Sequence, residues 1–473
     1  MKTFIQEAAY EKIRKALFFV CMVLVSVVII KMDTTTAQAA TKKELIIQIG
    51  KTKIYNTSED IVEGENWKYE KATNTLTISN VDLSKSEIYS YQKLKIKASG
   101  ENKIQKICVE DDYEKGYVRR NVFSIAGDEN ASIVNCSISS CSNLMIKNIS
   151  MANCSIYAGH TLSIANSFIM ETMYYASGIL IDNSTIESIK ADYDVFYASD
   201  EPGRDGLIIK NSTIKINTTA KTAVHLYGGK CTISDSVLDL TTKAAGLILW
   251  GEETTINNCD IKIRTTTTEG GTIGTPLDVE AAGSFQILNS DVEIMGKTCA
   301  MNISNTSTLI KNSTLDLTAQ TEYAVGLYHG DDTAYSFTVE NSNINLTAAK
   351  EGILCHGIKM IFKSGKLNAI SKKNSGIVME VDSYAPEIHP ALSIKGGTCN
   401  VTGKKYGIEF IADSKLSLTG GTLTLNGTKA AVNMTSKLPT GKAYSIKTGN
   451  SKNKAKSVSS YKKTDKYVFI KKK

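Results

Sequence analysis

The side chains in this sequence best suited to hold a ligand are aromatic residues that recur in similar short segments. His225 and Tyr227 lie in one such segment, Trp250 in the next and Tyr328 in a later one. Each segment alternates apolar residues with others, so on a strand the apolar residues point inward and these four point outward. Outward rings on a flat sheet can stack on the apolar faces of sugar rings. The alternative is that a neighbouring loop covers them.

Carboxylates follow the same segments and offer a second kind of chemistry. Asp278 and Glu280 fall in the segment after Trp250, and Asp331 and Asp332 follow Tyr328. Clustered carboxylates on rigid strands suit calcium, a hard cation that takes six to eight oxygen ligands. We therefore name these four acids as expected metal ligands and calcium as the expected ion. The alternative is that they are ordinary solvated acids.

An enzyme needs more than these groups. Glycoside hydrolysis uses two carboxylates at a defined separation, and lyases that cleave uronates need calcium with a basic residue near the sugar. The run from His329 to Asp332 is suggestive, but few arginines accompany it, with Arg204 and Arg264 the clearest. We therefore predict no catalytic residues. A polysaccharide lyase or glycoside hydrolase remains one alternative, and a structural adhesin is another.

A repeat along the chain indicates which elements hold these side chains. The turn line x-Leu/Ile-x-Ile/Val-x-Asn-Ser-x-Ile/Leu recurs with successive spacings of 23 to 32 residues. Its turn positions are Asn183, Asn211, Asp235, Asn258, Asn289, Asn312, Asn341, Ser364, Gly396 and Gly420. A fixed period in this range is typical of a solenoid.

The unit of this solenoid is built from strands. Both recurring lines alternate with period two, and no stretch after the N-terminal 39 residues keeps a helical rhythm. One coil of short strands cannot bury its inner face, whereas stacked coils share a continuous core. The prediction is an all-β, right-handed parallel β-helix of about ten to twelve coils with a cap at each end. Asn suits the turns because it tolerates left-handed backbone and can form side-chain ladders.

Composition changes predict the organisation of the chain. Residues 1–39 have a basic start, an apolar run from Ala16 to Ile30 and an Ala-Gln-Ala cleavage pattern, as in a secretory signal peptide. An uncleaved membrane anchor is the alternative. Residues 40–130 are expected to form the N-terminal cap with the first irregular coils, residues 131–441 the β-helix, and residues 442–473 a basic C-terminal cap or tail. Tyr193–Asp205 is expected to be an insertion between coils.

Cysteine use and charge limit the partners. Ten Cys are present, one of them in the leader, and none forms a CxxC pair, so we expect free thiols packed as small apolar groups. From Lys442 onward, eleven Lys stand against one acid, Asp465. Such a tail could contact an acidic polysaccharide or wall polymer, or could be a solvated arm. No nucleic-acid motif accompanies the charge, so no nucleic-acid partner is expected.

Several motifs resemble one known family. The chain is similar to exported bacterial parallel β-helix proteins described as carbohydrate-binding domain-containing, a family with a line such as GWxYDxxTNTLTL that resembles the N-terminal segment of this chain. The matching motifs are Asn66-Trp-Lys-Tyr69 with Asn74-Thr-Leu-Thr-Ile78, Lys395-Gly-Gly-Thr398 with Tyr406-Gly-Ile408, Thr419-Gly-Gly-Thr422, and Tyr467-Val-Phe-Ile470. The middle coils depart from the family by their Asn-Ser turns.

That resemblance implies a function. The signal peptide predicts a secreted or cell-surface protein with no membrane span after cleavage, and we expect a monomer that acts without catalysis. The resemblance implies polysaccharide binding. It further implies a ligand of acidic, plant cell-wall type and calcium in some members. The residues that would carry sugar binding here are His225, Tyr227, Trp250 and Tyr328.

Overall fold

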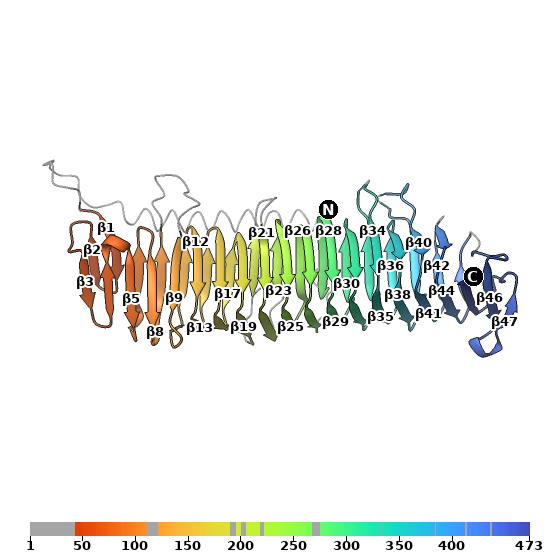
Figure 1. Ribbon diagram of the computed structural model, residues 1–473, viewed down its shortest axis with the longest axis horizontal. Coiled ribbons are helices and arrows are strands. Elements are labelled where there is room, and N and C mark those ends of the chain that lie inside the picture. Colours follow the sequence, from red (N-terminus) through yellow and green to blue (C-terminus); the bar gives the residue numbers. More distant parts are fainter. Residues whose placement is uncertain are drawn as a thin grey trace. The chain divides into compact units, whose positions relative to one another are not determined.

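The computed structural model is nearly all strand and confirms the parallel β-helix. It describes residues 43–110, 122–189, 195–199, 205–217, 222–266, 275–331, 333–383, 385–411, 414–435 and 438–473. The chain divides into two units, Met1–Glu44 and Leu45–Lys473, and the fold below is that of the second. Its strands succeed one another along one axis in sequence order (Figure 1).

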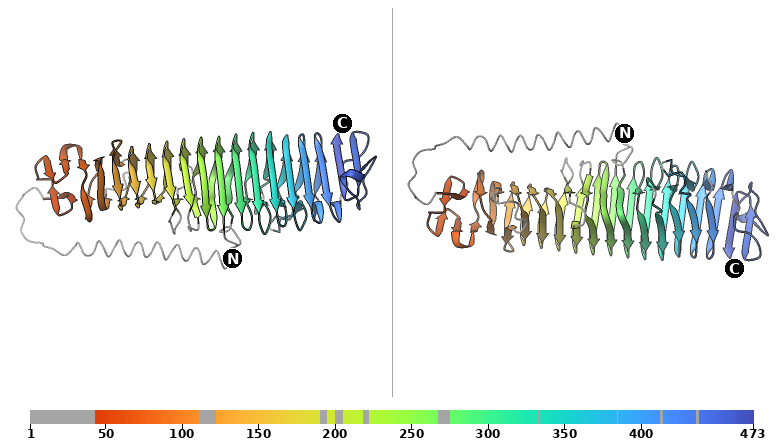
Figure 2. Two further views of the ribbon diagram at one scale, coloured as in Figure 1. Left: turned by 90° about the horizontal axis from the view of Figure 1, so that it is seen from below. Right: turned by 90° about the horizontal axis from the view of Figure 1, so that it is seen from above.

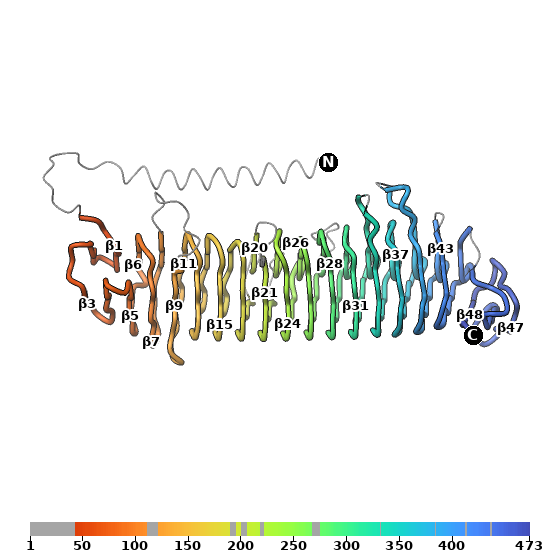
Figure 3. The backbone as a smooth tube through the Cα atoms, turned by 45° about the horizontal axis from the view of Figure 1, so that its top comes forward, coloured from red at the N-terminus to blue at the C-terminus, as the bar shows by residue number. Residues whose placement is uncertain are grey.

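Strand pairing divides the wall of the solenoid into three parallel sheets, and each turn of the chain adds one strand to each sheet. The backbone tube shows the chain winding coil after coil along the axis (Figure 3). Sheet S1, which precedes the Asn turn, contains β5(Thr75–Ser79), β7(Lys95–Ser99), β9(Val122–Gly127), β12(Asn143–Lys147), β15(Thr161–Ala165), β18(Gly178–Asp182), β21(Asp205–Lys210), β24(Lys230–Ser234), the later parts of β26(Ala245–Asn257) and β28(Leu277–Leu288), β31(Ser307–Lys311), β34(Ser336–Glu340), β37(Lys359–Phe362), β40(Ala391–Ile394) and β43(Lys415–Leu418).

Sheet S2 follows the Asn turn. It contains the first parts of β6(Asp82–Ser90) and β8(Glu101–Val109), then β10(Ser132–Val134), β13(Ser150–Ala152), β16(Phe168–Met170), β19(Thr185–Ser188), β22(Thr213–Asn217), β25(Val237–Thr242), β27(Asp260–Thr265), β29(Asp291–Gly296), β32(Thr314–Ala319), β35(Ser342–Ala348), β38(Gly365–Ser371), β41(Thr398–Gly403) and β44(Thr422–Gly427).

Sheet S3 completes each coil and carries the expected aromatic residues. It contains the later parts of β6 and β8, then β11(Ser137–Ser140), β14(Ser155–Ala158), β17(Met173–Ala176), β20(Phe196–Ser199), β23(Thr222–Tyr227), the first parts of β26 and β28, β30(Met301–Ser304), β33(Val325–Tyr328), β36(Ile353–His356), β39(Ile377–Glu380), β42(Tyr406–Phe410) and β45(Ala430–Asn433).

The described part of each sheet holds fifteen rungs, so the expected ten to twelve coils were too few. The missed coils are short. Asn148, Asn166 and Asn183 occupy one corner on successive rungs but are only 18 and 17 residues apart. A search for spacings of 23 to 32 residues cannot find them, and parallel stacking already begins at β5, far ahead of residue 131.

Two antiparallel caps close the solenoid, and the stack of rungs between them is visible from both sides (Figure 2). At the N-terminal end β1(Leu45–Ile49) pairs with β2(Thr52–Tyr55), and β3(Ile61–Gly64) pairs with β4(Trp67–Glu70), which continues through the 3-10 turn η1(Lys71–Thr73) into β5. At the other end β48(Tyr467–Lys472) lies antiparallel between β44 and β46(Tyr444–Gly449), and β47(Lys456–Val458), which follows η4(Lys452–Lys454), pairs with β46. The basic tail is therefore a folded cap, and a solvated arm is wrong for these residues.

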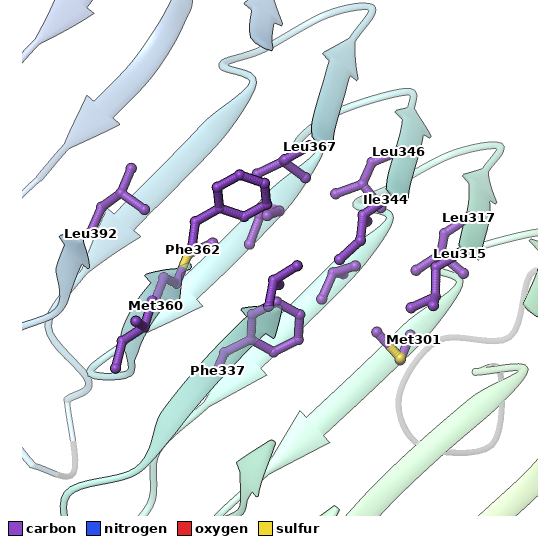
Figure 4. Close-up of a pocket in the computed structure, with 14 residues that line it drawn as sticks. Met301, Leu315, Leu317, Phe337, Ile344, Leu346, Met360, Phe362, Leu367 and Leu392 are labelled. Atoms are coloured by element: carbon purple, nitrogen blue, oxygen red, sulfur yellow. The ribbon is translucent and has the colours of Figure 1, made fainter. Parts of the chain in front are cut away.

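The interior is filled by apolar side chains from all three sheets. The inward positions of the three sheets are mostly Ile, Leu, Val and Phe, and the side chains there are almost fully buried. Figure 4 shows a small space in this interior, with Met301, Leu315, Phe337 and Phe362 among the residues around it. No residue lining it carries a hydroxyl, amide or charged group. Because ligand sites need some convergent polar groups, this space belongs to the core and is not a binding site.

The Asn turns form the predicted ladder. Asn211, Asp235, Asn258 and Asn289 all have left-handed backbone, with φ between 48° and 55°. The amide of Asn258 donates to Asp235 at 2.7 Å, and the backbone N–H of each turn residue bonds to the next rung. In the last coils, however, the left-handed residues are Gly365, Gly397 and Gly421, each one position after the expected Ser364, Gly396 and Gly420.

Candidate functional site

The outward side chains of S3 form two adjacent columns along the solenoid. In one column Tyr227 lies beside Trp250 on the next rung, and Trp250 lies beside Glu280 on the rung after it. In the other, His225 lies beside Ile248, which lies beside Asp278. The predicted alignment of these residues is confirmed. Tyr328 lies in the Tyr227 column, two rungs beyond Glu280, with Ser304 between them.

Trp250 is held across three rungs. Its ring contacts Tyr227 and His225 on the preceding rung, with centroid distances of 6.3 and 5.8 Å. Its indole Nε1–H donates to Asp278 on the following rung at 2.8 Å. The indole therefore lies along the solenoid axis, half-buried, while Tyr227 beside it is 57% exposed. These two rings are the exposed aromatic centre of the face.

Asp278 is an unusual residue for an outward position because it is only 4% exposed. Burial raises the pKa of its carboxyl to about 7, and Glu280 adds to the rise. Hydrogen bonds from Trp250 and Asn302 and the nearby His225 oppose the shift. The buried carboxyl of Asp278 thus fixes the indole through a hydrogen bond, while the Glu280 side chain next to it stays exposed.

A second aromatic group lies farther along the same column. Tyr328 stacks on His356 of the next rung, with ring centroids 5.0 Å apart and an interplanar angle of 20°. Its hydroxyl donates to the Tyr323 hydroxyl at 2.7 Å, and His356 contacts Glu380 at 3.1 Å. Burial raises the pKa of Tyr328 to about 12, so the phenol keeps its proton. Tyr328 is half-buried and presents less ring surface than Tyr227.

Sequence reasoning missed three aromatic residues of this face. Tyr157, Tyr175 and Tyr197 occupy the His225 column on the three preceding rungs. Their rings stack with centroid distances of 5.3 and 5.0 Å and interplanar angles of 12° and 4°. Tyr197 lies on β20, inside the stretch that was expected to be an insertion, so that expectation is wrong for residues 196–199. A Tyr-Ala pair repeated on three strands was the available signal.

The tyrosine ladder and the tryptophan differ in what they offer a ligand. Stacked rings cover each other's faces, so Tyr175 shows mainly its edge although it is 37% exposed. Trp250 is not covered in this way, because its ring contacts on the preceding rung are edge-on, at 86° and 63°. The ladder therefore stabilises the sheet, whereas Tyr227 and Trp250 leave ring surface available.

The expected metal ligands are not all brought together. Asp278 and Glu280 are neighbours on β28, but Asp331 belongs to a separate turn, where it accepts hydrogen bonds from the Tyr335 hydroxyl and the Thr333 N–H, both at 2.7 Å. Asp332 lies outside the described residues. Across the described ranges, no three His, Cys, Asp or Glu side chains converge as metal ligands. Calcium remains a prediction.

The charge of the S3 face is one-sided. Its twelve strands from β14 to β45 contain no Lys or Arg, and their acids are Asp278, Glu280, Glu380 and Glu409 in the parts that belong to S3. The other two sheets carry outward lysines such as Lys215 and Lys311, which form ion pairs at 3.3 and 3.0 Å. The charged side chains of the aromatic face are therefore all acidic, whereas the other two sheets carry charges of both signs.

Comparisons with protein families, with curated proteins and with solved structures find no match to this chain. The family resemblance of the coil motifs therefore stays a prediction. Residues 1–39, which are expected to be a signal peptide, lie outside the described residues. Among the residues that are described, no helix has the length and apolar character to cross a bilayer.

Proposed function

We propose that this solenoid binds a polysaccharide without catalysis along the outer face of S3, centred on Tyr227 and Trp250. The observation that supports it is the pair of rings on consecutive rungs, Tyr227 exposed and Trp250 half-buried, anchored by the Trp250–Asp278 hydrogen bond. An aromatic platform of this kind offers an apolar surface to a sugar ring, with Glu280 beside it to accept hydrogen bonds from hydroxyls.

The proposed chain of sugars lies along the solenoid axis. Rungs of a parallel sheet repeat about every 4.8 Å, which is close to the length of one sugar residue in an extended chain. Tyr227, Trp250, Glu280, Ser304 and Tyr328 follow one another rung by rung in this direction. A short oligosaccharide can therefore meet an aromatic ring at each end and polar groups between them.

The negative charge of the S3 face limits which sugar chains can bind there. A polyuronate placed on S3 would bring its carboxylates next to Glu280 and Glu380 with no lysine or arginine on those strands to offset them. Like charges at short range are unfavourable. We therefore assign S3 to uncharged sugar chains, and the acidic ligand implied by the resemblance does not fit this face.

The test is binding of soluble polysaccharides, measured as retardation in affinity gels and by calorimetry. The panel contains neutral glucans, mannans, xylans and chitin oligosaccharides, with polygalacturonate as the acidic member. Trp250→Ala should weaken binding of the retained neutral glycan at least about tenfold, or ~1.4 kcal/mol. Phe168→Ala is the matched control, because Phe168 is 41% exposed but lies on S2. No retention by any neutral glycan would contradict the proposal.

Asp278 also favours a second candidate, a glycoside hydrolase. A carboxyl with a pKa of about 7 is protonated in the way a general acid requires, and Glu280 follows it on the same outward side of β28. The burial of Asp278 behind Trp250 argues for the binding role instead. Release of reducing ends by the wild type, lost in Glu280→Gln and Asp278→Asn, would establish the hydrolase.

A further inference from the structure

A row of exposed lysines runs along the corner between S2 and S3 at the C-terminal end of the solenoid. The members of this lysine row are Lys372, Lys373, Lys404, Lys405, Lys429 and Lys466. Backbone hydrogen bonds hold them on successive layers: Lys405 N–H donates to Asn374, Lys429 N–H to Lys405, and Gly427 N–H to Lys466. The last of these residues comes from the C-terminal cap, so the cap extends the row.

This arrangement contrasts with the charge pattern of the rest of the wall. On S2 the outward column reads Glu187, Lys215, Asp239, Lys262 and Glu293 on successive rungs, with alternating sign. The same corner also shows compensation directly before the row, where Lys350, one rung earlier, contacts Glu322 of the preceding rung at 2.5 Å. Opposite charges on neighbouring strands stabilise a sheet and like charges destabilise it. The lysine row therefore lacks the alternation of charge seen in this column.

The acids described next to the row bind neutral groups and not its lysines. None of its six lysines forms an ion pair in the described part of the chain. Glu351, one rung earlier, accepts a hydrogen bond from Asn374 at 2.7 Å, and the carboxylate of Asp465 accepts one from the Lys462 N–H at 2.7 Å. Lys429 is held in place, with its Nζ 5.7 Å from the centre of the Tyr406 ring.

The sequence around the lysine row also carries a net positive charge. From Lys359 to Lys473 the sequence contains 22 lysines, no arginine and six acids. Lysine is a compact point charge, whereas arginine provides the planar fork that binds single carboxylates or phosphates in a bidentate way. A line of lysines with a rung spacing of about 4.8 Å suits a ligand whose anionic groups also repeat along a line.

We propose that the lysine row binds a linear anionic polymer, with carboxylate or phosphate groups placed along the corner rung by rung. This site is separate from the aromatic face of S3 and does not depend on the function proposed for it. Together the two sites would let one molecule hold an uncharged glycan and a polyanion at the same time.

The test compares two variants of equal charge on the full chain. The row variant changes Lys372, Lys373, Lys404, Lys405 and Lys429 to Gln. The control variant changes five ion-paired lysines elsewhere to Gln: Lys103, Lys215, Lys230, Lys262 and Lys311. The probes are oligogalacturonate, which carries carboxylates, and a linear polyphosphate of similar length, both measured by calorimetry at about 0.05 to 0.2 M salt.

The wild type should bind at least one probe, more weakly as salt rises, because binding releases counterions. The row variant should bind at least tenfold more weakly with a flatter salt dependence, and the control variant should stay within threefold of the wild type. The preferred probe identifies the anionic group. Equal losses in both variants, or no binding of either probe at 0.15 M salt, would overturn the proposal. Trp250→Ala should leave this binding unchanged.

Discussion

The indole of Trp250 and the carboxyl of Asp278 form a 2.8 Å hydrogen bond across one rung of S3. The bond joins an aromatic ring that can bind a ligand to a buried acid whose pKa is about 7. It follows that the position of the ring and the protonation of the acid are coupled. The first prediction tests this coupling.

Asp278 should make the local stability of S3 depend on pH. The unfolded chain has a carboxyl pKa near 3.9, whereas the folded carboxyl keeps its proton up to about pH 7. Between these values the folded state binds a proton that the unfolded state has released, so the free energy of unfolding falls as pH rises. The loss between pH 4 and pH 8 is at most about 4 kcal/mol.

Trp250 emission measures this effect. The chain has two tryptophans, so a Trp67→Phe background isolates Trp250. Urea transitions followed by this emission should occur at lower urea at pH 8 than at pH 5, and native emission should titrate near pH 7. Asp278→Asn keeps an acceptor for the indole N–H and should remove both trends. A titration that persists in this variant would assign the effect to another group.

Substitutions in the tyrosine ladder and at Trp250 should affect different properties, the first stability and the second glycan affinity. Tyr175 stacks between Tyr157 and Tyr197, so Tyr175→Ala loses two ring contacts and should lower stability by about 1–3 kcal/mol. Glycan affinity should stay within threefold, because the faces of this ring are already covered. Trp250→Ala should show the reverse pattern. If Tyr175→Ala weakens binding as strongly as Trp250→Ala, the ladder itself is part of the ligand surface.

The Asn ladder should respond differently to Ala and to Gly. Asn289 has φ 48°, its amide donates to Asn257 at 2.9 Å, and it accepts from Asn312 at 3.1 Å. Asn289→Gly and Asn289→Ala both lose the two side-chain bonds. Glycine has no Cβ and adopts left-handed backbone freely, whereas alanine keeps a Cβ there, at a cost of about 1 kcal/mol relative to glycine. Hydrogen exchange of the turn amides should therefore be faster in Ala than in Gly, and slowest in the wild type. Equal exchange in the two variants would contradict this account.

Removal of the C-terminal cap should cause self-association. Strand β48 covers β44 in antiparallel register from Thr422 to Asn426. A chain that ends at Thr440 leaves this edge unpaired, and unpaired edges recruit other strands. Light scattering should show concentration-dependent assembly of the truncated chain. A lysine at Thr424, on the exposed edge, should reduce the assembly. A monomeric truncated chain would mean that β44 is protected in another way.

The fold was largely predictable because one backbone requirement repeats. A left-handed residue is needed at the same corner of each coil, and Asn211, Asn289 and Asn312 mark it in the sequence. The early coils were harder, since 17 to 18 residues suffice when the corners are tight, and β20 was hidden in a polar stretch. The shift to Gly365 also escaped prediction, because Ser364 occupies the place of Asn in the sequence pattern.

The site was predictable only in part. Alternation placed Tyr227 and Trp250 outward on neighbouring rungs, and this is confirmed. The same alternation places Asp278 outward but says nothing of its burial, which depends on the indole of Trp250 lying over it. Ring orientation is likewise a property of packing, so the covered faces of Tyr175 follow from its neighbours and not from its own position.

The amide columns have one more property, a common direction. In the outer column of S2, Asn345 donates to Asp316, Asn368 to Asn345 and Asn400 to Asn368, so each amide points its NH₂ toward the N-terminal neighbour. Asn258 points to Asp235 in the same sense at the turn corner. Aligned amides add their dipoles as a helix does, with the positive end toward the N-terminus. An aspartate at the first position of such a column neutralises that positive end. The order of Asp and Asn in the sequence therefore gives the wall an electrical polarity along the solenoid axis.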